Sequence, residues 1–212
     1  MKISFAITVC NELEEIKTLI PFLLENKRVE DEIVILVDIS KEDNGELRGW
    51  LNETKQSLIL KNDPIKIHED KFQGHFGEWK NLLNSHCGGD YIFQLDADEM
   101  ISEYMVKNVH EILEMNKQID LIYVPRINTV NGLTEEHVKQ WGWRVNEKGW
   151  VNYPDYQGRI YRGHMKWHGK VHETIVGGQK ISTLPNDTDE YCILHHKQIG
   201  RQEKQNNFYK TI

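Results

Sequence analysis

Residues 88–99 read Gly-Gly-Asp-Tyr-Ile-Phe-Gln-Leu-Asp-Ala-Asp-Glu. The apolar run from Tyr91 to Leu95 has the length of a buried strand, and the glycine pair before it marks a turn. In open α/β sheets the ligand binds outside the carboxyl ends of the strands, and hard divalent cations prefer carboxylate oxygens. We therefore predict that Asp96 and Asp98 form a cation site that faces a phosphate-bearing substrate. The alternative is an acidic helix start, where the same side chains would favour the positive end of the helix dipole.

The composition indicates one globular domain over residues 1–212. The chain is 39% hydrophobic and 28% charged, which is enough to form a single well-buried core. The formal net charge of −7 and the pI near 5.8 argue against nucleic-acid binding, because neutralising phosphates requires clustered Lys and Arg. Partners are expected to be neutral or bridged by a metal ion.

The three cysteines, Cys10, Cys87 and Cys192, lie far apart and match neither a disulfide framework nor a zinc knuckle. The chain begins with a strand pattern rather than a signal peptide, and no apolar run approaches the ~20 residues of a membrane-spanning helix. We expect reduced thiols, no transmembrane segment and a cytoplasmic location.

Alternating apolar residues over 3–9 predict the first strand, and the small residues between them permit burial of both faces. Asn11 and Glu14 have the spacing of a capping box, which predicts a helix beginning at Glu12. Pro21 removes a backbone donor and is expected to kink or break this helix.

The continuous apolar run 33–37 predicts a fully buried parallel strand that ends at Asp38. Asp38 therefore stands at the same kind of strand end as Asp96. In the functional interpretation, the Asp38 side chain accepts a hydrogen bond from a nucleotide base or ribose. The alternative is a turn residue before the polar loop 40–45.

Alternating helix and strand patterns continue to the central stretch. Apolar positions within 47–58 suggest a second helix, residues 65–67 a short strand, and residues 76–86 a third helix. Repeated strand and helix patterns predict a parallel sheet with right-handed crossovers. Lys80 lies on the third helix, which precedes the acids, and could reach a diphosphate; a solvated helix face is the alternative.

Four segments in this order carry a family resemblance. They are Ile7-Thr8-Val9-Cys10-Asn11-Glu12, the strand ending in Asp38, Lys80-Asn81, and Gly89-Asp90-Tyr91-Ile92 with Leu95-Asp96-Ala97-Asp98-Glu99. Together they resemble the family 2 glycosyltransferases of the GT-A fold, with the strongest match to members that carry Asp-Ala-Asp-Glu. An isolated Asp-x-Asp motif is a weak signal, whereas four elements at successive predicted strand ends are a strong one.

The resemblance implies a Rossmann-like, mostly parallel sheet flanked by helices, with a small antiparallel subsheet on the acceptor side. Residues 1–100 would bind the nucleotide sugar and residues 101–212 the acceptor. By the same resemblance, four side chains would surround the base and ribose, namely Thr8, Asn11, Glu12 and Asp38. Lys80 would lie near the phosphates, and Asp96 and Asp98 would bind the ribose and the metal.

The second half begins with a helix opened by Ser102 and a strand over 121–124 that Pro125 closes. The following segment, residues 126–157, is too polar for a core and too aromatic for a disordered loop. Its large rings are Trp141, Trp143, Trp150, Tyr153 and Tyr156. Such rings suit the apolar face of a sugar, with plain packing and a partner surface as alternatives.

Residues 159–162 and 167–173 read as two strands, paired antiparallel with a turn near Gly163-His164. By spacing alone His172 is more often a structural residue than a ligand. However, the run Tyr-x-x-Tyr-Gln-x-Arg-Ile-Tyr-Arg, followed by Val-His-Glu, resembles the acceptor half of the same glycosyltransferases. That resemblance makes Glu173 the candidate catalytic base and His172 a further candidate ligand.

A last strand over 191–194 leads into His195-His196 and then into a helix-prone tail, residues 198–209. In the GT-A fold a late histidine often completes the metal shell, and the resemblance assigns this role to one of these two. Strand alternation would direct His195 and His196 to opposite sides, so only one is expected to bind. Carboxylate, imidazole and diphosphate ligands would suit Mn²⁺ at least as well as Mg²⁺. The alternative is an ordinary pair of strand-end histidines.

The favoured hypothesis is a metal-dependent, inverting glycosyltransferase that moves a sugar from a nucleoside diphosphate, UDP above all, to a hydroxyl of a glycan, lipid-linked or protein acceptor. Inversion is implied by the resemblance, and Glu173 is preferred to Asp155 as the base. A nucleotidyltransferase is disfavoured, because residues 11–14 are acidic where a triphosphate loop would be basic. A carbohydrate-binding protein that has kept the fold but lost turnover is the third hypothesis.

Overall fold

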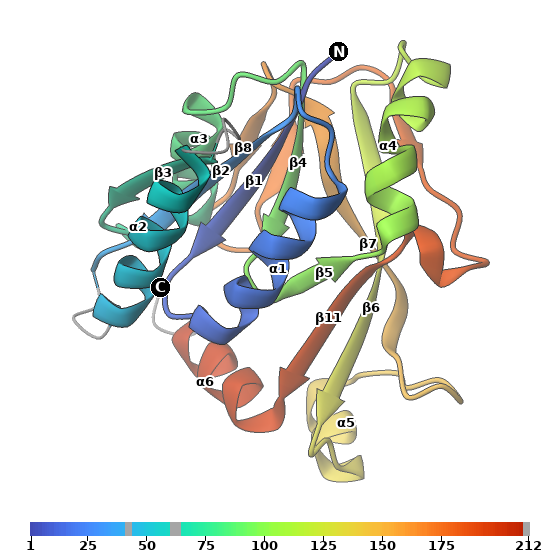
Figure 1. Ribbon diagram of the computed structural model, residues 1–212. Helices are drawn as coiled ribbons and strands as arrows, with labels where there is room; N and C mark the ends of the chain where they lie inside the picture. Colours follow the sequence, from blue (N-terminus) through green and yellow to red (C-terminus); the bar gives the residue numbers. More distant parts are fainter. Residues whose placement is uncertain (41–43, 60–64, 210–212) are drawn as a thin grey trace.

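A computed structural model describes residues 1–40, 44–59 and 65–209 of the chain (Figure 1). Within these residues one large sheet runs in the order β3-β2-β1-β4-β7-β6-β11-β5, with β10 paired to β6, and a separate two-stranded sheet consists of β8 and β9. The large sheet therefore includes strands from both halves of the chain. The polar loop predicted over 40–45 lies partly outside the described residues.

The first half is the parallel part of the sheet, as the sequence predicted. Its strands are β1 (Ile3–Val9), β2 (Glu32–Asp38), β3 (Ile65–Asp70) and β4 (Tyr91–Asp96). The connecting helices are α1 (Leu13–Asn26), α2 (Gly45–Ile59) and α3 (Phe76–Ser85). Because β2 and β4 both pair with β1 in parallel, their carboxyl ends meet at one edge of the sheet.

The second half adds antiparallel pairs. It contains β5 (Glu99–Ile101), α4 (Glu103–Met115), β6 (Leu121–Asn131), α5 (Glu135–Trp141), β7 (Val151–Arg162), β8 (Lys166–His168), β9 (Thr174–Val176), β10 (Ile181–Thr183), a 3-10 turn over Asp189–Tyr191, β11 (Ile193–Gln198) and α6 (Ile199–Tyr209). β7 is antiparallel to both β4 and β6, whereas β11 is parallel to β6. The expected mostly parallel sheet with a small antiparallel subsheet is confirmed.

The central strands are buried on both faces. Phe5 and Ile7 of β1 join the cluster that α1, α2 and α4 cover, whereas Ala6 between them joins the cluster formed with α3 and the small β8-β9 sheet. This alternation follows from the two-residue period of a strand. The small residues that alternate with the large ones along β1 leave room for the layer formed by α3 and the β8-β9 sheet.

Pro21 does not break its helix, and Pro125 does not close its strand. Pro21 lies inside α1, which continues unbroken to Asn26, and the buried face of this helix is held on the sheet on both sides of the proline by Ile16, Leu19, Ile20 and Leu23. Pro125 lies inside β6 rather than at its end. It falls between the stretches of β6 that pair with β10 and with β11, so its missing N–H interrupts neither pairing.

Three local predictions also needed correction. α1 has no capping box, because Glu12 and not Asn11 is its N-cap residue and no side chain caps it. Residues 159–162 and 167–173 do not pair with each other: β7 joins the large sheet, and β8 pairs with β9. The last strand begins at Ile193, two residues later than predicted, so His195 and His196 lie within it.

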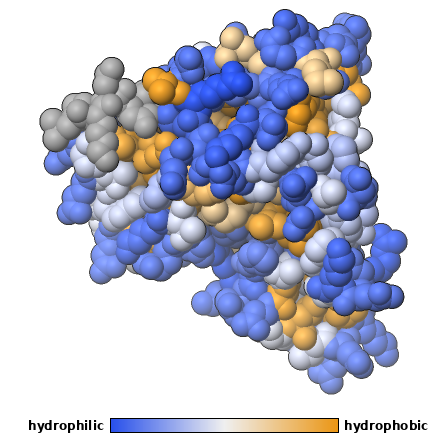
Figure 2. Space-filling model, turned by 45° about the vertical axis from the view of Figure 1, so that its right-hand side comes forward, coloured by the Kyte–Doolittle hydropathy of each residue, from blue (hydrophilic) through white to orange (hydrophobic). Residues whose placement is uncertain are grey.

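The face of the molecule drawn in Figure 2 is mostly hydrophilic. α5 and the segment after it project from the body of the molecule, and Figure 2 shows an apolar patch on this projecting part. Leu133, Val138 and Val145 line a shallow groove there. Across the described ranges, no helix has both the length and the apolar character needed to cross a bilayer.

Candidate active site

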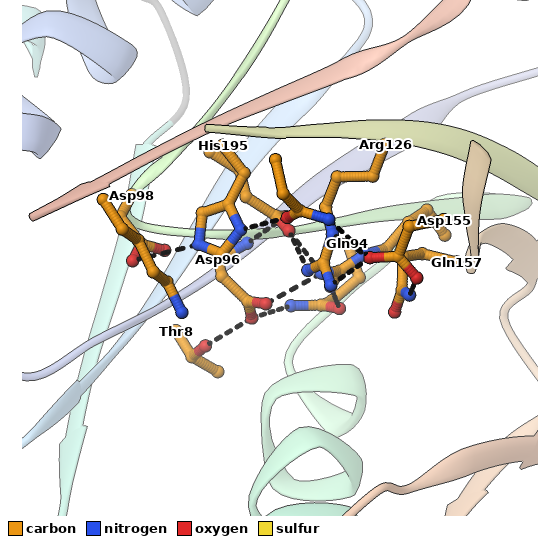
Figure 3. Close-up of polar contacts among 12 residues, drawn as sticks. Thr8, Gln94, Asp96, Asp98, Arg126, Asp155, Gln157 and His195 are labelled. Carbon is orange, nitrogen blue, oxygen red and sulfur yellow. Dashed lines mark hydrogen bonds and ion pairs between the residues drawn. The ribbon is translucent and has the colours of Figure 1, made fainter. Parts of the chain in front are cut away.

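The carboxyl ends of β1 and β4 place Thr8 beside Asp96. The two residues are partners in the parallel register, and Thr8 Oγ1 lies 3.5 Å from Asp96 Oδ1 (Figure 3). Figure 3 shows that the polar groups around them come from distant parts of the chain. The strand-end acids predicted from residues 88–99 thus lie at the centre of a polar cluster.

Asp96 is bound by an arginine from the second half of the chain. Arg159 Nη2 donates to Asp96 Oδ2 at 2.8 Å, and Gln94 Nε2 donates to Asp96 Oδ1 at 3.0 Å. Burial alone would raise the pKa of Asp96, but the charges of Arg159 and Lys80 outweigh burial and hold this pKa well below its usual range. Asp96 is therefore a carboxylate at neutral pH.

A second layer of charge lies beneath Asp96. Glu99 is fully buried, its Oε2 accepts a hydrogen bond from the Asp96 backbone N–H at 3.0 Å, and its Oε1 accepts from Arg159 at 2.6 Å and from Arg126 at 2.9 Å. Arg126 continues to Asp155, with Nη2 to Oδ2 at 2.7 Å. Buried charges in such an alternating network each have a partner, which makes the network rigid.

Asp98 faces the last strand rather than this network. Asp98 Oδ2 lies 3.4 Å from His195 Nε2 and 3.6 Å from Arg201 Nη2 of α6. The other ring nitrogen of His195, Nδ1, lies 2.8 Å from Asn128 Oδ1 and donates a hydrogen bond to that oxygen. Nε2 therefore faces Asp98: it donates to the carboxylate when the ring is protonated, and it carries the free lone pair when the ring is neutral. Burial would raise the pKa of Asp98, yet the hydrogen bond and charge of His195 and the charge of Arg201 lower it overall.

The donor atoms of Asp98 and His195 fit two positions of a cation shell. Neighbouring ligands of an octahedral Mg²⁺ with bonds of about 2.1 Å lie about 3 Å apart, close to the 3.4 Å between these two atoms. Within the described parts of the chain no group of three or more His, Cys, Asp and Glu is arranged to hold a metal ion. A cation would therefore take its remaining ligands from a substrate and water.

Asp38 organises the loops around the end of β2. Its Oδ1 accepts hydrogen bonds from the backbone N–H groups of Ser40 at 2.8 Å and Phe72 at 3.1 Å, and its Oδ2 accepts from the Ser40 hydroxyl at 2.9 Å. Asp38 is buried. Its contacts in this structure are those of a turn residue, which was the alternative interpretation. A base or ribose role for Asp38 stays a prediction.

Asn11 and Glu12 lie where β1 ends. Asn11 is exposed, whereas Glu12 Oε2 accepts hydrogen bonds from the backbone N–H groups of Cys10 at 2.7 Å and Asn11 at 3.1 Å. Glu12 Oε1 pairs with Arg201 Nη2 at 2.6 Å, and Arg201 Nη1 reaches Glu15 Oε1 at 2.7 Å. The tail helix α6 is therefore tied to the beginning of α1 beside the candidate site.

Glu173 reaches the cluster from the opposite side. Its Oε1 lies 2.7 Å from Lys80 Nζ, which is 3.7 Å from Asp96 Oδ1. His172 beside it is exposed, with a positive φ of 52°. His196 is also exposed and bonds to Thr129, which confirms that strand alternation separates it from the buried His195. Of the three candidate histidines, the structure brings His195 to Asp98.

The aromatic segment forms two groups outside this cluster. Trp141 and Trp143 lie 4.7 Å apart by ring centroids at the end of α5, and Trp150 and Tyr153 are likewise 4.7 Å apart. The second pair lines a cavity of about 840 Å³ together with residues 186–189. A sugar-binding role for these rings stays a prediction.

Sequence reasoning missed the side chains that hold the acids in place, namely Gln94, Glu99, Arg126, Asn128, Arg159 and Arg201. Gln94 was detectable, since it lies two residues before Asp96 and a strand directs such residues to one face. Arg159 belongs to the Tyr-x-x-Tyr-Gln-x-Arg run that resembles the acceptor half of the family, but nothing in that run indicated that it meets Asp96. Arg126 and Arg201 gave no local signal.

A parallel half whose strands end in acids, joined to an antiparallel half across the same edge, is the GT-A arrangement of glycosyltransferases. The chain matches the model of glycosyl transferase family 2 over residues 4–175, and it belongs to that family.

Solved structures of TarS from S. aureus share the fold. TarS 1-349 has a TM-score of 0.59 at 15% identity, covering 92% of this chain and 60% of that one. TarS 1-349 in complex with UDP has a TM-score of 0.61 at 14% identity, over 92% and 60% of the two chains. The complex with UDP-GlcNAc has 0.59 at 16% identity, over 93% and 59%. The present chain thus spans about 60% of the length of these TarS chains.

Proposed function

We propose that this protein is a metal-dependent, inverting glycosyltransferase that transfers a sugar from a nucleoside diphosphate, with UDP as the favoured nucleotide, to an acceptor hydroxyl. The observation that carries the proposal is the pairing of Asp98 with His195 beside the ionised Asp96, at the edge where four strands of the parallel half end. Family membership and the UDP and UDP-GlcNAc complexes of TarS support this donor class.

In this proposal Asp98 and His195 hold Mn²⁺ or Mg²⁺, and Asn128 fixes the tautomer of the histidine. The bound cation supplies charge neutralisation for the departing diphosphate. Thr8 and Asp96 would contact the ribose, and their pairing at the ends of β1 and β4 supports this assignment. In the Asp-Ala-Asp-Glu stretch, Asp96 would then bind the sugar donor and Asp98 the metal ion, and Glu99 would have a structural role.

Glu173 is the proposed base, and the contacts of Asp155 support this choice. Asp155 Oδ2 accepts hydrogen bonds from Arg126 and Asn128, and its Oδ1 accepts from Gln157. Both of its oxygens are therefore engaged in the structural network. Glu173 makes one ion pair, through Oε1, and within the described residues its Oε2 has no protein partner. A positioned carboxylate contributes roughly 10² to 10⁴ in rate.

A thermal-shift panel of nucleoside diphosphates with and without Mn²⁺ tests the donor site. UDP with Mn²⁺ at about 100 times its Kd should stabilise the native state by about 2.7 kcal/mol, or about 5–10 °C in Tm. Asp98→Ala should remove the metal-dependent part of the shift, whereas Glu111→Ala, at an exposed carboxylate of α4, serves as the control and should keep it. Equal shifts with and without metal would argue against the cation site, and no shift with any nucleotide would argue against the donor site.

Turnover separates an enzyme from a binding protein of the same fold. Slow release of UDP from a UDP-sugar in Mn²⁺, abolished by a chelator, is expected of an enzyme. The anomeric configuration of the released sugar, followed by NMR, tests inversion: retained configuration would contradict the single-displacement role of Glu173. The nature of the acceptor and a cytoplasmic location stay predictions.

A further inference from the structure

Lys80 is a buried lysine whose charge lies between two carboxylates. Its side chain is 7% exposed, and its Nζ is 2.7 Å from Glu173 Oε1 and 3.7 Å from Asp96 Oδ1. The ring of Trp167 covers it, with its centroid 4.5 Å from Nζ. A buried ammonium requires ionic and hydrogen-bond partners, and the protein itself supplies them here. Lys80 therefore differs from an exposed lysine, whose charge would be available to bind a phosphate.

The loop that carries Glu173 is attached to the same helix as Lys80. Asn81, the next residue of α3, donates from Nδ2 to the Trp167 carbonyl at 2.8 Å and accepts from the Trp167 N–H at 2.8 Å. At the start of α3, the N–H of Gly77 donates to the Gly169 carbonyl at 3.0 Å. One rigid helix therefore fixes both members of the Lys80–Glu173 pair.

The geometry of the pair suits a carboxylate that must be oriented. Lys80 engages Oε1 only, and the other oxygen, Oε2, has no partner among the described residues. The ion pair therefore fixes the direction of the carboxylate while leaving one oxygen available to accept a proton. Fixed orientation of a reacting group is a large part of catalysis, because a misplacement near 1 Å costs on the order of 10² in rate.

We propose that Lys80 is a positioning residue that holds Glu173 in place for proton abstraction and takes no part in binding the diphosphate. This inference rests on the proposed function, in which Glu173 is the base. It assigns to Lys80 an effect on turnover that passes through Glu173, its partner at 2.7 Å. The longer pairing with Asp96, at 3.7 Å, is tested separately by the Kd of UDP.

A double-mutant cycle tests this assignment. Lys80→Met, Glu173→Gln and the double variant are compared by initial rates of UDP release from a UDP-sugar with Mn²⁺, and by calorimetric titration with UDP. We expect Lys80→Met to lower kcat about 10- to 100-fold, with KM and the Kd of UDP within about twofold of wild type. The double variant should be no slower than Glu173→Gln alone, because the two residues act as one unit.

Two conservative variants keep the test valid if Lys80→Met folds poorly. Lys80→Arg preserves the charge and should recover part of kcat, whereas Lys80→Gln preserves only a hydrogen bond and should recover less. An order of magnitude lost in UDP affinity, with uridine affinity unchanged, would identify a diphosphate-binding lysine and overturn the inference. Multiplicative losses in the double variant would overturn it as well. A wild-type protein that neither binds UDP nor releases it would instead overturn the proposed function, and this inference with it.

Discussion

Replacing Gly77 with alanine should separate α3 from the loop that carries Glu173. A Cβ atom at this position would lie 2.7 Å from the Gly169 carbonyl oxygen, whereas C···O contacts are normally no closer than about 3.3 Å. The two backbones must therefore move apart by roughly 0.6 Å. The movement strains two hydrogen bonds, from Gly77 N to Gly169 O at 3.0 Å and from Phe76 N to Lys170 O at 2.9 Å. These bonds satisfy N–H groups that a helix start leaves without intrahelical partners.

The expected effects are moderate in stability and larger in turnover. Weakening two hydrogen bonds costs about 1–3 kcal/mol, offset by about 1 kcal/mol of helix propensity gained on replacing glycine with alanine. We expect a net loss of about 1 kcal/mol in the free energy of unfolding. A displacement of about half an ångström at Glu173 should lower kcat about tenfold, since about 1 Å costs on the order of 10². UDP affinity should not change.

Urea unfolding and UDP release from a UDP-sugar measure the two effects. Gly49→Ala in α2 is the matched control, because it is also a helical glycine but an added Cβ there meets no atom within 4 Å. The control should gain up to about 1 kcal/mol and keep its kcat. If Gly77→Ala behaved like this control in both measurements, the docking of the loop on α3 would not position Glu173.

Three further predictions concern buried polar and charged side chains. Glu32 is fully buried, and although burial opposes its ionisation, hydrogen bonds led by that from Lys2 lower its pKa from 4.5 to about 2. A lowered carboxyl pKa stabilises the fold above pH 4.5, and this stability is lost as the pH falls towards 2. Between pH 6 and pH 3 wild type should therefore lose about 2 kcal/mol more than Glu32→Gln in urea unfolding, and parallel losses would contradict this. Arg159→Met should lower the free energy of unfolding by about 3–5 kcal/mol, because it leaves Asp96 without its arginine. A loss below about 1 kcal/mol would contradict this and show that water solvates Asp96 in place of the arginine. Asn128→Ala should weaken calorimetric Mn²⁺ binding about 10- to 100-fold in the presence of UDP without changing UDP binding alone, and unchanged Mn²⁺ affinity would mean that Asn128 does not orient a metal ligand.

The sequence by itself determined the parallel half of the molecule. The two-residue alternation of β1, the continuous apolar run of β2 and the acids at the end of β4 are local signals, because a strand of fixed period sends neighbouring side chains to opposite faces. The same rule is sufficient to place His195 and His196 on opposite faces of β11. Asp96 and Asp98 followed from their position directly after a buried strand.

Only the tertiary structure decided which side chains meet these acids. Arg159 lies 63 residues from Asp96 in sequence, and His195 lies 97 residues from Asp98. Such pairs depend on how β7 and β11 join the sheet, and strand pairing is set by packing over the whole core rather than by local propensity. The same holds for Pro125, which lies between the stretches of β6 that pair with β10 and with β11.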